Sequence, residues 1–180
     1  QHWELQSNNW ENLYQLDFTL DNARQIFELI YGEMYNVIVH ANDVLRFLEK
    51  NGAVIESGQT RDVIEGEARA IRAFVHFDVL RLFGQMPFEP GKTVRLGYAE
   101  TVGKQEIPFL DFDSYVEKLL KDLDMAEALL AESDPLLVKS LATLDETGEN
   151  EDFFLDYRRF RFNLYAVKAL KARVNLYLGR

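Results

Sequence analysis

Apolar residues recur every three or four positions over long stretches of this chain, and this spacing sharply limits the folds available to it. From Asp21 to Lys50 the apolar positions are separated by 4, 4, 3, 4, 3 and 4 residues, and they are Ile26, Ile30, Met34, Val37, Ala41, Val44 and Leu48. A helix gathers such positions on one face, whereas a half-buried strand requires alternation. Asn51-Gly52 follows, and a glycine just past the last periodic residue commonly ends a helix. The spacing predicts a helix over residues 21–50.

Three further segments carry the same helical signal. The first begins near Thr60, a favourable N-cap residue, and stops at Gly84. The second begins with the capping box Ser114–Glu117 and closes at the Asp-Pro of residues 134–135, and the third covers residues 163–178. We expect a short helix around residues 10–14 as well. We also expect four aromatic side chains in the core, namely Phe74, Phe77, Phe83 and Phe88.

The segment between residues 85 and 111 lacks any sustained period and is rich in residues that break regular structure: Pro87, Pro90, Gly91, Gly97, Gly103 and Pro108. We expect a long irregular loop with short extended pieces around residues 94–96. Loops of this length in compact domains tend to be functional or mobile. A second, acidic surface loop is expected over residues 146–152. The predicted fold class is therefore all-α, built from antiparallel helix pairs with one long irregular loop.

Composition excludes several classes of partner and site. Lys and Arg number 20 against 30 Asp and Glu, which gives a formal charge of −10 at pH 7. This balance argues against nucleic acid, whose phosphates need a basic surface, and against docking on an anionic membrane by charge. The chain has no cysteine, which removes disulfides, thiol nucleophiles and cysteine-based metal sites. No apolar run approaches the roughly 18 residues of a membrane span.

Motifs for catalysis and metal binding are absent from the sequence. It has no HExxH zinc motif, no GxSxG elbow, no SxxK motif, and neither a GxxxxGK[ST] nor a GxGxxG phosphate loop. The opening spacing of a calcium loop at Asp111 and Asp113 lacks the glycine and the closing glutamate. We predict no catalytic residues, no metal and no cofactor, so that the chain binds rather than reacts.

The densest charge cluster on a predicted helix consists of four residues: Glu65, Glu67, Arg69 and Arg72. A carboxylate site is one interpretation, but three- and four-residue spacing suits ion pairs along a helix, such as Glu65 with Arg69. We interpret the cluster as structural. His76 precedes Asp78 by two residues, and an acid–base pair is conceivable. Residues two apart on a helix do not face each other, which favours a buried, hydrogen-bonded histidine instead.

Three aromatic residues outside the strong helices are candidates for saccharide binding: Trp3, Trp10 and Tyr98. An exposed aromatic ring suits the apolar C–H face of a sugar, while neighbouring polar groups reach the hydroxyls. The alternative is that Trp10 and Tyr14 pack on the helices. For Tyr98, in the long loop, both interpretations stay open.

A distinctive sequence motif begins at residues 66–74, GEARAIRAF, and continues with FDVLRLFG at residues 77–84 and Pro87. This run resembles the signature helix of the SusD/RagB family. Other segments resemble the family in the expected order: Tyr35 with residues 41–45, residues 115–130, and residues 163–178. The resemblance covers about residues 10–180. One departure is Val75-His76, where two tyrosines are common in the family.

The resemblance implies a non-catalytic protein of tetratricopeptide-like helix pairs at the outer face of a Gram-negative outer membrane. Family members bind glycans or other oligomers and cap a SusC-type TonB-dependent transporter. They are lipoproteins, held to the membrane through an N-terminal lipid anchor that this chain does not contain. Family members are also longer, so we expect residues 1–180 to form one SusD-like helical domain of a longer protein.

Two other functions fit a helical scaffold of this kind. One is an adaptor that holds a protein or peptide partner in the groove of a helical repeat. The other, weaker alternative is a helical hydrolase that uses paired carboxylates in a cleft. Saccharide-sensitive binding favours the glycan-binding function, a peptide-binding groove favours the adaptor, and turnover favours the hydrolase.

Overall fold

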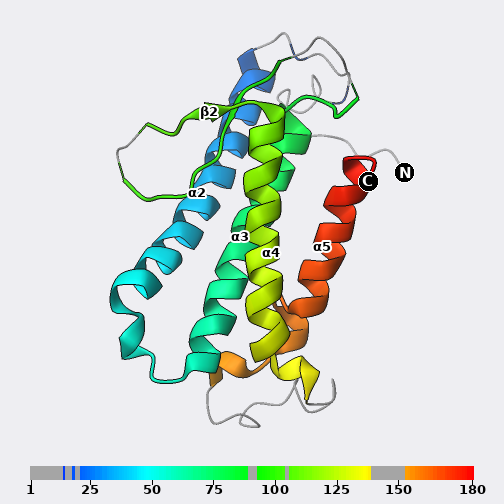
Figure 1. Cartoon of the computed structure of the whole chain (residues 1–180). Helices are drawn as coiled ribbons and strands as arrows, with labels where there is room; N and C mark the ends of the chain where they lie inside the picture. The colour runs from blue at the N-terminus through cyan, green and yellow to red at the C-terminus, as the bar shows by residue number, and fades with distance from the viewer. Residues whose placement is uncertain (1–13, 15–17, 19–20, 89–92, 104–105, 139–152) are drawn as a thin grey trace, which may run out of the picture.

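A computed structural model describes residues 14, 18, 21–88, 93–103, 106–138 and 153–180 of the chain. Long helices dominate these residues and run alternately in opposite directions: α2 (Asp21–Asn51), α3 (Gly58–Phe83), α4 (Phe112–Ser133) and α5 (Leu164–Tyr177). Each of them packs against the next one along the chain, so the helices lie side by side in sequence order (Figure 1). The prediction of an all-α fold built from antiparallel helix pairs is confirmed.

Short elements connect the helices. The 3-10 turn η1 (Gly52–Val54) leads from α2 to α3, and η2 (Pro135–Leu137) follows α4. Two further 3-10 turns precede α5, namely η4 (Phe153–Leu155) and η5 (Arg158–Phe160). In the long loop between α3 and α4, β1 (Leu96–Gly97) pairs antiparallel with β2 (Phe109–Leu110). The extended pieces expected near residues 94–96 correspond to β1.

The helix ends follow local capping chemistry, and two predicted N-caps are wrong. Ser57, rather than Thr60, caps α3, because its side-chain oxygen accepts a hydrogen bond from the Thr60 N–H at 3.1 Å. Asp111, rather than Ser114, caps α4 and accepts from the Ser114 N–H at 2.8 Å. In both cases a good acceptor stands three residues upstream of the predicted cap, which extends the first turn. The predicted ends at Gly84 and Asp134 are confirmed as C-cap residues.

The main core lies where α3, α4 and α5 meet. Phe77, Tyr115, Leu119, Leu123 and Val167 are among its fully buried side chains. This close packing explains a glycine in α3, because a Cβ on Gly66 would lie 2.8 Å from the Leu130 side chain of α4. Only a residue without a side chain lets the two helices approach this closely.

Burial differs from expectation at several apolar positions. Phe77 lies in the core and Phe74 and Phe83 are partly buried, but Phe88 is 73% exposed, so its assignment to the core is wrong. Phe88 lies beyond Gly84, where the chain has already left the α3 face. On α2 the predicted buried stripe is also wrong in part, because Ile30, Val37 and Val44 are each more than one-third exposed. In the described part of the chain α2 packs against α3 on one side, which covers a narrower face than the stripe provides.

The remaining sequence expectations concern a short N-terminal helix, an acidic loop and membrane crossing. Tyr14 has helical backbone, while the rest of the short helix expected over residues 10–14 and the acidic loop over residues 146–152 lie outside the described residues. No helix among the described residues is both long enough and apolar enough to cross a membrane.

Replacing Phe77 by alanine should lower the free energy of unfolding by about 3–5 kcal/mol, since the ring is fully buried and its removal leaves a cavity. Urea unfolding measures this change. Phe88→Ala is the matched control, because an exposed ring removes little apolar surface from water and should cost less than about 1 kcal/mol. Equal costs for the two variants would contradict the burial described above.

Candidate functional site

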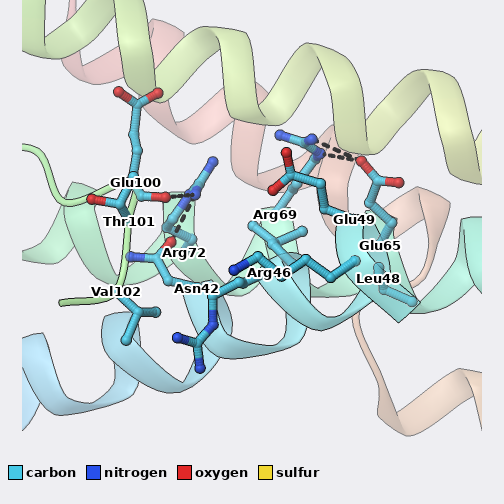
Figure 2. A pocket seen from close by; sticks show the side chains of 12 residues that line it. Asn42, Arg46, Leu48, Glu49, Glu65, Arg69, Arg72, Glu100, Thr101 and Val102 are labelled. Atoms are coloured by element: carbon cyan, nitrogen blue, oxygen red, sulfur yellow. Dashed lines mark hydrogen bonds and ion pairs between the residues drawn. The ribbon is translucent and has the colours of Figure 1, made fainter. Parts of the chain in front are cut away.

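A cleft of about 710 Å³ opens between α2, α3 and the segment that follows β1. Asn42, Arg46 and Glu49 line it from α2, Glu65, Arg69 and Arg72 from α3, and Glu100, Thr101 and Val102 from the loop. Figure 2 shows these side chains converging from the three elements. The cleft is therefore a polar hollow with charges of both signs at its walls.

A buried ion pair forms the floor of this cleft. The Arg72 guanidinium of α3 donates to the Asp122 carboxylate of α4 through two bonds, Nε–Oδ2 at 2.7 Å and Nη2–Oδ1 at 2.5 Å. Both side chains are 5% exposed. Such a two-point contact fixes the relative orientation of both groups as well as their distance. It thereby sets the register between α3 and α4.

Further groups form hydrogen bonds with both members of this pair. Arg72 Nη1 donates to the Asn42 side-chain oxygen at 2.7 Å and to the Glu100 backbone oxygen at 3.3 Å, as drawn in Figure 2. The Asn42 side-chain nitrogen donates in turn to the Ala99 backbone oxygen at 3.0 Å. The Tyr98 hydroxyl donates to Asp122 at 2.6 Å. The pair therefore ties α2, α3, α4 and the loop together in one network.

Electrostatics keep this network charged. Burial acts to lower the pKa of Arg72, but the hydrogen bonds and the charge of Asp122 outweigh burial and raise that pKa above its ordinary value. Isolated burial of either charge would be costly, whereas a pair with all partners present is tolerated. Arg72 is therefore committed to the scaffold.

The walls of the cleft carry ion pairs that are closer to solvent. Arg69 contacts Glu65 one turn earlier through two bonds of 2.9 and 2.7 Å (Figure 2), which confirms the predicted Glu65–Arg69 pair. Arg46 donates to Asp43 at 2.6 Å, and Lys118 pairs with Glu100. Chemically, these walls offer donors and acceptors that suit the hydroxyl groups of a polar ligand.

A second buried guanidinium ties the far end of the helices together. Arg158 is fully buried and pairs with Glu67 of α3 and with Asp134 at the end of α4, the latter at 2.9 Å. Asp134 also accepts from the Leu164 N–H at 2.9 Å, where α5 begins. Arg161 adds a further bond to Glu67. The structural interpretation of Glu67, Arg69 and Arg72 is confirmed, because all three pair with residues outside α3. Arg69 does so through Asp122 of α4, whose Oδ1 lies 3.5 Å from its Nη1.

His76 lies fully buried in α3, where its ring contacts the rings of Tyr98 and Tyr115. Its Nδ1 is 2.8 Å from the Tyr115 hydroxyl and its Nε2 is 3.4 Å from the Ala99 backbone oxygen. Burial is the main cause that lowers the pKa of His76 to about 3, so the ring is neutral at pH 7. The Tyr115 hydroxyl also donates to the His76 backbone oxygen at 2.9 Å, so both ring nitrogens and this hydroxyl belong to one hydrogen-bonded group. The expectation of a buried, hydrogen-bonded histidine is confirmed, while Asp78 pairs with Arg81 instead.

The predicted saccharide-binding aromatics do not come together in the described residues. Trp3 and Trp10 lie outside them, and Tyr14 is exposed. Tyr98 is 2% exposed and stacks on His76 with ring centroids 3.8 Å apart. Of the two interpretations left open for Tyr98, the structure supports packing in the core, where its hydroxyl positions Asp122 rather than meeting a ligand.

Sequence reasoning missed the buried Arg158 and three partners of the buried arginines, namely Asn42, Asp122 and Asp134. One signal was present for Asp122, because it stands three residues after Leu119 and four before Ala126, on the apolar face of its helix. A carboxylate at such a position requires a buried partner. Arg158 precedes the last predicted helix and stands outside any periodic apolar pattern, so it carries no comparable signal.

The buried His76 predicts a specific pH dependence of stability. An unfolded histidine takes up a proton near its ordinary pKa of about 6.5, whereas the folded ring does so only near 3. Stability present above pH 6.5 is therefore lost as the pH falls, by about 1.4 kcal/mol per unit between pH 6 and 4. Urea unfolding at several pH values measures it, with His76→Phe as the comparison.

The phenylalanine keeps a ring against Tyr98 but cannot titrate, so the difference between the two proteins should change with that slope. Other titrating groups contribute equally to both and cancel. Parallel stability curves for the two proteins over this range would contradict a neutral buried His76.

Among the described residues, no group of three or more histidine, aspartate or glutamate side chains is arranged to hold a metal ion. A comparison with curated proteins finds no match for this chain. A comparison with protein families finds one described as starch-binding and associating with the outer membrane, which matches residues 1–144. The matched region includes the signature helix α3, the cleft and both residues of the Arg72–Asp122 pair. The chain therefore belongs to the SusD-like family of starch-binding proteins that associate with the outer membrane.

Proposed function

We propose that this chain is the helical part of a surface-exposed nutrient-binding lipoprotein that captures glycans for a SusC-type TonB-dependent transporter. The observation that carries the proposal is the family match over residues 1–144, whose family binds starch and associates with the outer membrane. The proposal adds to it the transporter partner, attachment through a lipid anchor on the full-length precursor, and a binding rather than catalytic role. It also takes residues 1–180 as one helical domain of a longer protein.

The distribution of charged groups supports a binding role. The buried cations Arg72 and Arg158 are held by Asp122, Asp134 and Glu67, so these groups serve the scaffold. At the surface, the cleft walls present positively charged donors and negatively charged acceptors in pairs. Such groups suit hydroxyl-rich ligands of no net charge. A rigid scaffold that carries its ligand contacts at the surface is the arrangement expected of a capture protein.

The glycan contacts proposed from sequence remain Trp3 and Trp10. Both are tryptophans in the family-matched region, and a tryptophan ring offers the largest flat apolar face for a sugar. Tyr98 is not proposed as a contact, because its ring is covered by His76 and Tyr115.

Native electrophoresis of the chain in gels with and without soluble starch tests this function, together with an assay for newly released reducing ends. We expect retarded migration in starch and no release of reducing ends. Retardation should weaken in the double variant Trp3→Ala/Trp10→Ala. Unretarded migration with α-glucans would contradict glycan capture, and release of reducing ends would favour the hydrolase alternative.

A further inference from the structure

A second hollow, of about 580 Å³, lies at the opposite end of α2 from the charged cleft. Its floor is aromatic and comes from two elements: Phe27 and Tyr31 on α2, and Phe83 at the end of α3. Figure 1 shows these two helix ends, the start of α2 and the end of α3, next to each other. This aromatic hollow shares no lining residue with the polar cleft.

The rings of the hollow support one another in edge-to-face contacts. The Phe83 ring meets Tyr31 at a centroid distance of 5.1 Å and Phe27 at 6.5 Å, both with interplanar angles of 88°. Phe18 meets Phe27 at 5.5 Å. Such contacts fix ring orientation, while Phe27 and Phe18 remain 36% and 51% exposed. The hollow therefore offers preformed, partly solvent-facing aromatic surface.

Polar groups border this aromatic surface at one-turn intervals along α2. Asp21, Arg24 and Glu28 line the hollow, and Arg24 donates to Glu28 at 2.8 Å. The carboxylate oxygens of Asp21 and Glu28 can accept hydrogen bonds from the hydroxyl groups of a ligand. The guanidinium hydrogens of Arg24 that Glu28 does not bind can donate to such hydroxyl groups. An apolar floor with a polar rim matches the two kinds of surface on a sugar ring.

Gly32 lines the hollow and adds no side chain to it. It lies in the interior of the 31-residue helix α2, where glycine is less favourable than alanine. Its backbone is helical, and a Cβ built on it meets nothing within 4 Å. Neither backbone conformation nor packing within the described residues requires a glycine there. A side chain at this position would project into the space beside the rings.

We propose that this aromatic hollow is a saccharide subsite that binds glucose units of an α-glucan. The inference rests on the proposed function and names one surface at which the glycan would bind. Its size lies within the range of small-ligand pockets, about 300–1,000 Å³. The combination of aromatic floor, polar rim and open glycine favours a short oligosaccharide as the occupant.

Isothermal titration with maltoheptaose, together with electrophoresis in starch gels, tests the subsite. Gly32→Trp fills the hollow, and we expect at least about tenfold weaker binding. Gly32→Ala leaves most of the space and should bind within about twofold of the original chain while melting at a higher temperature. His40→Trp is the control, since it places the same tryptophan side chain at an exposed position two turns further along α2.

Phe27→Ala provides a second test that removes a ring instead of adding one, and it should also weaken binding. Thermal melting confirms that each variant is folded. Loss of binding in Gly32→Trp and Phe27→Ala, with binding kept in Gly32→Ala and His40→Trp, would support the subsite. Unchanged binding in Gly32→Trp would overturn the subsite and leave glycan capture standing. Absence of glucan binding by the original chain would overturn both.

Discussion

The buried pair between Arg72 and Asp122 is the interaction on which the arrangement of the helices depends. Two unlike charges taken out of water are tolerated only when every donor and acceptor around them is satisfied. Here the partners come from α2, α4 and the loop after β1, namely Asn42, Asp122, Tyr98 and the Glu100 backbone. Movement of any one of these elements would leave a charge or a hydrogen-bonding group without its partner, so the network fixes register where apolar packing alone would allow sliding.

This division of labour explains how a strongly acidic chain can serve as a binding scaffold. The buried cation Arg72 joins α3 to α4 near the middle of both helices, and the buried cation Arg158 joins them near the end of α4. Apolar burial then fills the space between them. Among the described residues, a charged cleft lies at one end of α2 and an aromatic hollow at the other. Membership in a starch-binding family that associates with the outer membrane agrees with a rigid scaffold that presents such surfaces.

Periodicity predicted the helices well because burial of an apolar face decides where a long helix forms. It predicted exposure less well, since Val37 and Val44 belong to the stripe but lie beyond what α3 covers. It also misplaced the N-caps of α3 and α4, where two possible capping residues stand three positions apart. The upstream residue, Ser57 or Asp111, caps the helix in each case. The Arg72–Asp122 contact joins residues 50 apart in sequence. Tyr98 is buried although it belongs to a loop that has no periodic apolar pattern. Such contacts depend on tertiary structure that local patterns do not contain.

A double-mutant cycle on the buried pair tests the central role of this interaction most directly. Urea unfolding would be measured for Arg72→Met, Asp122→Leu and the variant with both changes. Each single change leaves a charge buried without its partner and should cost about 3–5 kcal/mol, while the double change should cost clearly less than their sum. Single changes below about 1 kcal/mol that add independently would contradict a scaffold held in register by this pair.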